Sequence, residues 1–136
     1  MLQLTQKLNN GEMLVQEVPA PVLGKGMVLV KNHFSLISAG TEGSTVSAAR
    51  KSLLGKAKEK PQQVRQVIEV LQQQGPLQTY RAVTKKLEAY SPLGYSSAGE
   101  VISVGEGVTE FKAGDLVACA GAGYANHAEL IVVPFN

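Results

Sequence analysis

Hydrophobic and polar positions alternate in short runs at the N-terminal end of the chain. Leu2 and Leu4 alternate with polar residues, which is the pattern of a strand with one buried face. Residues 9–11 read Asn-Asn-Gly, and Asn-Gly is the strongest short signal for a hairpin because both central positions need a positive φ. We therefore predict a hairpin whose returning strand covers residues 13–18. The apolar run at residues 27–32 predicts a further, mostly buried strand.

The C-terminal end shows the same kind of pattern. Strands are predicted at residues 97–104, 116–120 and 127–134. Glycine-containing turns at residues 105–107 and 112–115 separate them. Short strands divided by turn signals are typical of a barrel or sandwich rather than of alternating strands and helices.

Between these two ends the hydrophobic period changes to that of a helix. Pro61 is placed to open a helix, since its missing N–H would have no partner there in any case. Apolar residues then follow at i, i+3, i+4 and i+7, namely Val64, Val67, Ile68 and Leu71. Gly75 and Pro76 end this helix and predict a second one at about residues 76–89. Residues 44–58 predict a third helix.

Charge and glycine content separate the same two parts of the chain. The net charge is +2, but residues 44–92 hold nine Lys/Arg and three Asp/Glu, and so carry +6. The rest of the chain carries −4 and holds twelve of the fourteen glycines. We predict one domain over residues 1–136 of class α+β, mainly β. Its β frame covers residues 1–43 and 93–136, and a basic helical insert covers residues 44–92.

Composition excludes several classes of protein. The single cysteine, Cys119, cannot form a disulfide framework or an all-cysteine zinc module. No apolar run reaches the roughly 18 residues that a membrane span needs. The N-terminus lacks the apolar block of a signal peptide. We therefore expect a cytoplasmic protein that does not bind membranes.

Residues 121–126, Gly-Ala-Gly-Tyr-Ala-Asn, bear a first likeness to a dinucleotide-binding fingerprint. The last position is asparagine instead of glycine, and the residues that follow have the pattern of a strand instead of a helix. Only thirteen residues remain after Gly123, too few for the rest of that unit. We interpret the segment as a flexible turn and expect no cofactor-binding residues in this chain.

Metal and nucleic-acid binding are also weighed. His33, His127 and Cys119 could supply metal ligands, but their spacing matches no short ligand motif, and such residues near strands usually pack or form hydrogen bonds. The basic set of the insert has no helix-turn-helix signature, aromatic platform or zinc finger beside it. A solvated helix face is the simpler interpretation, so we expect no metal and no nucleic acid. The members of this basic set are Arg50, Lys51, Lys56, Lys58, Lys60, Arg65, Arg81, Lys85 and Lys86.

An ordered series of segments in the frame resembles a known family. The segments are Leu23–Asn32, Leu36–Glu42, Gly94–Val101, Val104–Val108, Phe111–Val117, Tyr124–Glu129 and Val132–Pro134. Together they resemble the GroES-like catalytic domain of the medium-chain dehydrogenase/reductases, the alcohol dehydrogenase superfamily. The resemblance implies a GroES-like barrel in an oxidoreductase whose NAD or NADP is bound mainly by a following Rossmann domain. That domain is absent from this chain, so we expect an N-terminal piece that is inactive alone and has its own C-terminal Rossmann domain as a partner.

The insert resembles one branch of this superfamily. Ser52–Ala57, Pro61–Val67 and Pro92–Gly99 are similar to segments of bacterial two-part oxidoreductases. In these proteins a zinc-type dehydrogenase module is followed by a Gfo/Idh/MocA-type dehydrogenase module. Many are associated with surface-polysaccharide or sugar metabolism, so the resemblance implies a sugar-like small-molecule substrate.

The chain departs from the family at both zinc-ligand segments of this domain. Ser38 or Ala39 stands where zinc-dependent members have cysteine, and Tyr95 stands where the Gly-His-Glu motif has histidine. Serine, alanine and tyrosine are poor zinc ligands beside thiolate and imidazole. We therefore expect a zinc-independent enzyme.

Other groups must then handle the proton of an alcohol or polarise a carbonyl. By its place in the resemblance, Thr41 could relay a proton and Tyr95 could donate one to the substrate oxygen. Ser38 and Ser96 could line the pocket, and Glu42 could orient its neighbours. The simpler alternative is that these hydroxyl groups only satisfy the local backbone at turns.

The insert springs from between these two segments, which favours a lid or specificity element. Lys85 and Lys86 would then suit an anionic substrate, such as a phosphorylated or nucleotide-linked sugar. A rival interpretation is a non-catalytic interaction module whose basic insert docks a partner or polyanion. The sequence leaves the oligomeric state open.

Overall fold

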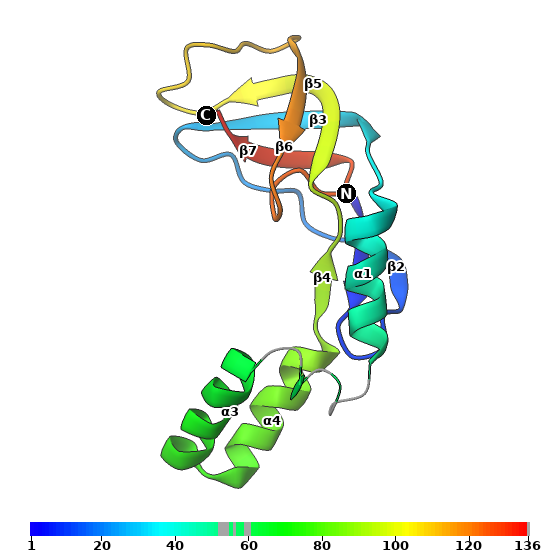
Figure 1. The fold of residues 1–136 in the computed structure, drawn as a ribbon. Coiled ribbons are helices and arrows are strands. Elements are labelled where there is room, and N and C mark those ends of the chain that lie inside the picture. Colours follow the sequence, from blue (N-terminus) through cyan, green and yellow to red (C-terminus); the bar gives the residue numbers. More distant parts are fainter. Residues whose placement is uncertain (52–54, 56, 59–60, 136) are drawn as a thin grey trace. The chain divides into compact units, whose positions relative to one another are not determined.

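The computed structural model describes residues 1–51, 55, 57–58 and 61–135. Its elements follow the order β1 (Leu2–Lys7), β2 (Met13–Glu17), β3 (Met27–Ser35), α1 (Ala39–Arg50), α3 (Pro61–Gln74), α4 (Pro76–Glu88), β4 (Tyr90–Pro92), β5 (Ser96–Val104), β6 (Leu116–Ala120) and β7 (Leu130–Pro134) (Figure 1). The mainly β, GroES-like class predicted from the sequence is confirmed.

The chain forms two compact units. The first contains residues 1–5, residues 14–42 and the chain from residue 92 to the C-terminal end. The second contains residues 6–13 and 43–91. The hairpin tip at residues 6–13 thus belongs with the helices, although the sequence pattern placed it in the frame.

The first unit is built on a four-stranded antiparallel sheet with the order β6-β5-β3-β7. Val30 of the central strand β3 lies opposite Val101 of β5 and Ile131 of β7. Alternate β3 residues therefore point to one face, and Val28 and Val30 are 3% and 0% exposed. The core comprises Val28, Val30, Val101, Val108, Cys119, Ala125, Ile131 and Val133. Each fully buried valine stabilises the fold by about 1.5–3 kcal/mol relative to an exposed one.

A second sheet has the order β2-β1-β4. Its β1–β2 hairpin confirms the predicted pair of strands, and Lys7 N–H donates to the Glu12 carbonyl at 2.8 Å across the turn. Gly11 has φ of 74°, but no residue other than glycine has a positive φ among the described residues. The expected two-residue Asn-Gly turn, which needs two positive φ values, is therefore wrong, and the loop is longer.

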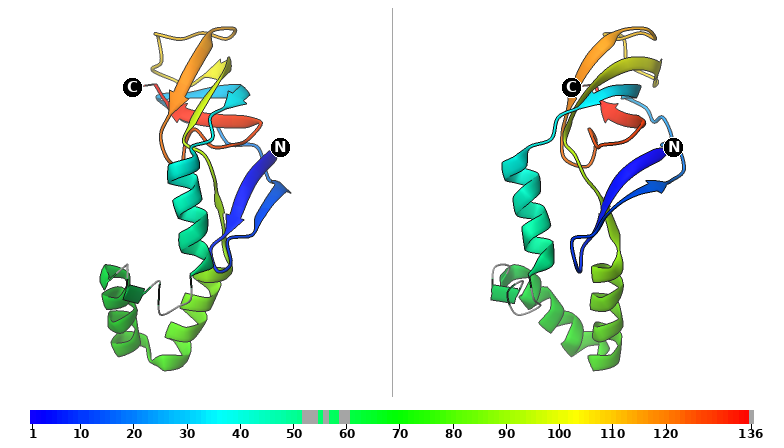
Figure 2. Two further views of the ribbon diagram at one scale, coloured as in Figure 1. Left: turned by 45° about the vertical axis from the view of Figure 1, so that its right-hand side comes forward. Right: turned by 90° about the vertical axis from the view of Figure 1, so that its right-hand side faces the viewer.

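The second unit contains the helical hairpin of α3 and α4, which lie side by side in both views of Figure 2. The helices predicted at residues 61–74 and 76–89 are confirmed to within one residue. Gly75 joins them, with φ of 80° and its N–H bonded to the Leu71 carbonyl. The stripe of α3 packs incompletely, however, because Val67, Ile68 and Leu71 stay 38–46% exposed.

The helix expected at residues 44–58 begins earlier than predicted. α1 starts at Ala39 because Ser38 precedes it as a cap, and the Ser38 Oγ accepts from Thr41 N–H at 3.3 Å. Gly40 and Gly43 lower the helix propensity of this turn, which hid it from the sequence pattern. α1 ends at Arg50, and residues 52–54, 56, 59 and 60 of the expected helix, with Lys56 and Lys60 of the basic set, lie outside the described residues.

Several strand boundaries also differ from expectation, and β3 runs on to Ser35 instead of ending at Asn32. The last strand begins at Leu130 instead of His127, because side-chain hydrogen bonds from Asn32 hold the preceding residues. The short strand β4 lies at residues that the sequence pattern assigned to the helical insert. Within the part of the chain that the structure describes, no helix is long and apolar enough to cross a membrane.

Candidate functional site

Two segments that lie far apart in the sequence meet in the first unit. Strands β3 and β5 are antiparallel neighbours, so the end of β3 lies beside the start of β5. Leu36 N–H donates to the Ser96 carbonyl at 2.9 Å. The structure thus brings the segment of Ser38–Glu42 next to that of Gly94–Ser96, which are the two segments with substituted ligand positions.

A carboxylate and an imidazole form the polar centre of this region. Glu42 lies in the first turn of α1, where the helix dipole favours negative charge. Its Oε1 lies 3.1 Å from Nε2 of His127. The His127 and Glu42 side chains are only 7% and 14% exposed. A charge-assisted hydrogen bond in such shelter from water is stronger than the same bond at the surface.

Several backbone contacts hold His127 in place. Its N–H donates to the Leu93 carbonyl at 2.8 Å, and its own carbonyl accepts from Leu4 N–H at 2.8 Å. Asn32 Nδ2 donates to the Asn126 and Ala128 carbonyls, on either side of His127, at 3.2 and 2.8 Å. The backbone that carries His127 is therefore held by β1, by β3 and by the segment before β5.

Gly94 packs directly against His127. An added Cβ at residue 94 would lie 2.6 Å from His127 N and 2.9 Å from its Cγ. Gly94 also has φ of +99°, a conformation that side chains other than glycine's disfavour. Both the close approach and the backbone conformation require glycine here.

One atom of the pair is buried without a hydrogen-bond partner. Among the described residues, the buried side-chain atoms without a partner are Gln6 Nε2, Asn32 Oδ1, Ser97 Oγ, Asn126 Oδ1 and His127 Nδ1. If Nε2 carries the proton donated to Glu42, the neutral imidazole has an unprotonated Nδ1. A buried polar atom without a partner costs about 1–3 kcal/mol. His127 Nδ1 is therefore a buried acceptor or donor that the described protein groups do not satisfy.

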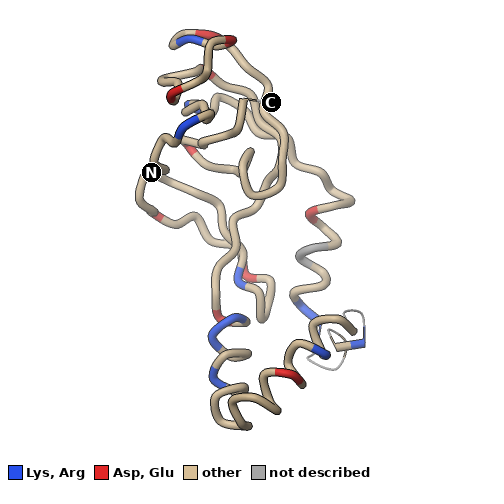
Figure 3. The backbone as a smooth tube through the Cα atoms, turned by 90° about the vertical axis from the view of Figure 1, so that its left-hand side faces the viewer, with Lys and Arg blue, Asp and Glu red and all other residues tan. Residues whose placement is uncertain are grey.

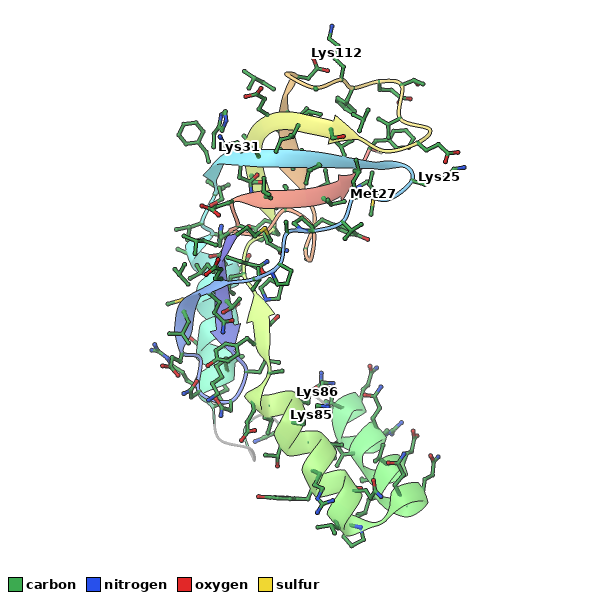
Figure 4. The ribbon with its side chains drawn as sticks, turned by 180° about the vertical axis from the view of Figure 1, so that it is seen from behind. Lys25, Met27, Lys31, Lys85, Lys86 and Lys112 are labelled. Atoms are coloured by element: carbon green, nitrogen blue, oxygen red, sulfur yellow. The ribbon has the colours of Figure 1, made fainter. Side chains whose placement is uncertain are left out.

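The other predicted site residues have separate surroundings. Ser38 Oγ caps α1 by accepting from Thr41 N–H, so this hydroxyl satisfies the local backbone. Thr41 lies exposed in the first turn of α1. Tyr95 and Ser96 are half-buried, and the Tyr95 carbonyl accepts from Gly121 N–H at 2.8 Å. Lys85 and Lys86 lie in α4 of the second unit, as Figure 4 shows.

The sequence pattern around His127 predicts only a packing or hydrogen-bonding side chain and no place in the site. The structure gives it that hydrogen bond, and the partner is Glu42. The two residues lie 85 positions apart, so no local spacing could have paired them. The hydrogen bonds from Asn32 to residues 126 and 128 and the close approach of Gly94 to His127 also join distant parts of the sequence, so local spacing does not predict them.

The donor set does not fit the zinc ion of the zinc-dependent relatives. Within the described residues no group of three or more His, Cys, Asp or Glu is arranged to hold a metal. Glu42 and His127 are bonded to each other, and Tyr95 is a poor ligand. Cys119 is buried in β6, where burial raises the pKa of its thiol, and His33 is exposed on β3.

The glycine-containing segment at residues 121–126 is a turn. Gly121 and Gly123 have φ of 132° and 86°, and Ala125 N–H donates to the Gly121 carbonyl at 3.0 Å. Strand β7 follows this turn instead of a helix. The segment therefore lacks the helix N-terminus on which a dinucleotide-binding fingerprint places its phosphates.

Several solved structures are similar to this chain in fold. An alcohol dehydrogenase superfamily protein from Novosphingobium aromaticivorans is 22% identical with a TM-score of 0.62, covering 98% of this chain and 32% of that one. The quinone oxidoreductase from Coxiella burnetii is 21% identical with a TM-score of 0.58, covering 99% and 35%. A crotonyl-CoA carboxylase/reductase AntE variant in complex with NADP is 18% identical with a TM-score of 0.57, covering 98% and 34%.

The chain spans about a third of the length of these neighbours. No curated protein sequence matches it. The family described as the alcohol dehydrogenase GroES-like domain matches residues 24–134, which is most of the chain. The resemblance seen in the ordered segments is thereby confirmed. The chain belongs to the alcohol dehydrogenase GroES-like domain family.

Proposed function

We propose that this chain is the substrate-side domain of a zinc-independent, NAD(P)-linked oxidoreductase that acts on an alcohol or carbonyl of a sugar-like substrate. One observation carries the proposal. The two segments that bear zinc ligands in other members lie next to each other, Tyr95 and hydroxyl-bearing residues stand in them in place of those ligands, and Glu42 contacts His127. The fold of NAD(P)-linked relatives supports the oxidoreductase class, with the cofactor held mainly by a following domain.

Oxidation of an alcohol requires that its hydroxyl proton leave as hydride departs from the adjacent carbon. Without a Lewis acid, side chains of the protein have to hold and move that proton. Tyr95 has a phenol that can hydrogen-bond the substrate oxygen, and Thr41 has a hydroxyl that can relay a proton. Ser38 and Ser96 belong to the same two segments and would line the substrate pocket. The isolated chain would show no turnover, since it lacks the domain that supplies the cofactor.

The test of this proposal uses the full-length protein. Tyr95→Phe removes one hydroxyl and keeps the ring, so kcat/KM should fall at least tenfold if the phenol assists the reaction. Metal analysis of the purified protein should find no stoichiometric zinc. An unchanged kcat/KM in Tyr95→Phe would remove this residue from the site, and one tightly held zinc per chain would refute the zinc-independent part.

The substrate class rests on the charge of the second unit. Lys85 and Lys86 lie in the last turn of α4. Figure 3 shows the Lys and Arg positions of the chain in blue. A pair of adjacent ammonium groups would suit a phosphorylated or nucleotide-linked sugar. Lys85→Gln with Lys86→Gln should raise KM for a nucleotide-linked sugar and leave KM for a neutral sugar alcohol unchanged. Equal KM values for both kinds of substrate would refute the anionic preference. Lys112→Gln is the matched control, because Lys112 lies in the first unit, in the loop before β6.

A second candidate function, a non-catalytic docking module, has one observation in its favour. The second unit contains a cavity of about 710 Å³, lined mostly by aliphatic side chains of α1, α3 and α4 together with Lys51 and Lys86. A polyanion would pair with Lys85 and Lys86 in the last turn of α4. Binding to heparin that weakens steeply with salt, in a protein without turnover, would favour this function over the enzyme.

A further inference from the structure

We propose that Glu42 is the catalytic carboxylate of this site and that His127 is the residue that positions it. This inference rests on the proposed function, since it assigns the proton transfer of that reaction. It departs from the sequence analysis, which gave Glu42 only an orienting role and gave His127 none.

The two oxygen atoms of Glu42 differ in their surroundings. Oε1 accepts the hydrogen bond from His127 Nε2 at 3.1 Å. Among the described residues, Oε2 is not one of the buried side-chain atoms that lack a hydrogen-bond partner. The Glu42 side chain keeps 14% of its surface exposed, so it is not sealed off from solvent. One oxygen is anchored and the side chain is partly exposed, which is the arrangement that a positioned acid or base requires.

His127 itself is poorly placed to touch a substrate. Its Nε2 is engaged by Glu42, and its Nδ1 is buried without solvent contact. Gly94 packs on the ring and the backbone nitrogen, so nothing larger can approach from that side. His127 therefore acts through Glu42, in the way that a fixed partner orients the reacting group of a catalytic pair.

The proton transfer balances with groups named here. In the oxidative direction the O–H bond of the alcohol breaks, and its proton passes to Glu42 Oε2. The electron pair of the adjacent C–H bond leaves with its hydrogen as hydride to an oxidised nicotinamide, and the carbonyl double bond forms. The protonated Glu42 then releases its proton to solvent, and the reductive direction reverses each step.

The test uses the full-length protein, with a panel of sugar alcohols and nucleotide-linked sugars and with NAD⁺ or NADP⁺. Glu42→Gln keeps the shape of the side chain and its acceptor for His127, but it cannot take a proton at Oε2. We expect kcat to fall about 10²–10⁴-fold with little change in KM. Glu42→Ala should regain part of its activity when formate is added, a rescue that a purely structural role would not show.

His127 is tested by two replacements. His127→Gln keeps an N–H donor for Oε1 and should retain most of the activity. His127→Phe fills the space of the ring without a donor, and kcat should fall by up to about 10²-fold, because small displacements of a catalytic group are that costly. The matched control is Glu106→Gln, which makes the same chemical change in an exposed pair with Lys25 and should change nothing.

The outcomes separate the two proposals. A wild-type protein that turns over no member of the panel would overturn the proposed function, and this inference with it. An active wild type with undiminished Glu42→Gln would overturn this inference alone. Loss of activity in Glu42→Ala without rescue by formate, together with equal activity of His127→Gln and His127→Phe, would also overturn it.

Discussion

Substitution of Gly94 by alanine tests whether the contact between residue 94 and His127 is as tight as the structure shows. The added Cβ would lie 2.6 Å from a backbone nitrogen and 2.9 Å from a ring carbon, both below the approach that real Cβ atoms tolerate. Neither neighbour is the free end of a flexible side chain. His127 N–H is bonded to Leu93, and its ring is bonded to Glu42, so relief of the clash would break one of these contacts.

Two costs add at this position. A non-glycine residue at φ of +99° loses about 1–2 kcal/mol from backbone strain. An extra methyl group forced into a packed site costs about 1–3 kcal/mol more. We therefore expect Gly94→Ala to lower the free energy of unfolding by about 2–5 kcal/mol in total.

Gly107→Ala provides the matched control for this prediction. Gly107 has φ of +88°, close to that of Gly94, but an added Cβ there meets nothing within 4 Å. It carries the strain without the clash, so its cost should stay near 1–2 kcal/mol. Urea unfolding of both variants, followed by circular dichroism, measures the difference if the slope with denaturant stays constant. Equal unfolding free energies for the two variants would refute the tight contact between Gly94 and His127.

Further predictions concern Asn32 and Cys119. Asn32→Leu should cost about 1–3 kcal/mol in urea unfolding, because the Ala128 carbonyl loses its 2.8 Å partner; a variant as stable as the wild type would refute the role of this amide. Cys119 should react slowly with a maleimide at neutral pH and quickly in urea, because its side chain is buried and burial raises the pKa of the thiol. The pKa of Cys119 in the folded protein lies above the unfolded value of about 8.5, because burial favours the neutral thiol. The contribution of this thiol to the free energy of unfolding is therefore fully present below that pH. It should be lost as pH rises through the folded pKa, and Cys119→Ala should remove that part of the pH dependence.

Most of the regular structure could be predicted because its signals are local. The stripe from Val64 to Leu71, with Pro61 before it and Gly75 after it, was enough to place α3. The apolar run of β3 likewise placed the central strand. The start of α1 could not be predicted, because two glycines weaken the propensity of its first turn and the cap at Ser38 is visible only as a hydrogen bond. Strand β4 is three residues long and is defined by its partner β1 instead of by its own sequence.

The site could be predicted only in part. The resemblance to the family pointed to Ser38–Glu42 and Gly94–Ser96 as the segments of the site. In the structure these two segments lie next to each other. The polar contact between Glu42 and His127 depends on the pairing of strands from opposite ends of the chain, which a single sequence does not reveal. The roles of Thr41, Tyr95, Lys85 and Lys86 in a reaction stay predictions.

Strand β3 is connected to both Glu42 and His127. From its C-terminal end the chain runs through Leu36 and Ser38 directly into α1, which carries Glu42. From its side, Asn32 holds the segment of His127 by two amide hydrogen bonds, and its N–H donates to the Glu129 carbonyl at 2.9 Å. Both partners of the pair are thus connected to the central strand β3. Glu42 follows β3 along the chain, and the segment of His127 is bonded to Asn32 of β3. A catalytic carboxylate needs such rigid support, because loss of position costs rate before it costs binding. If Glu42 acts as we propose, Asn32→Leu should lower kcat by more than its loss of stability accounts for at temperatures where the variant is fully folded, whereas an unchanged kcat would show that the pair does not depend on β3.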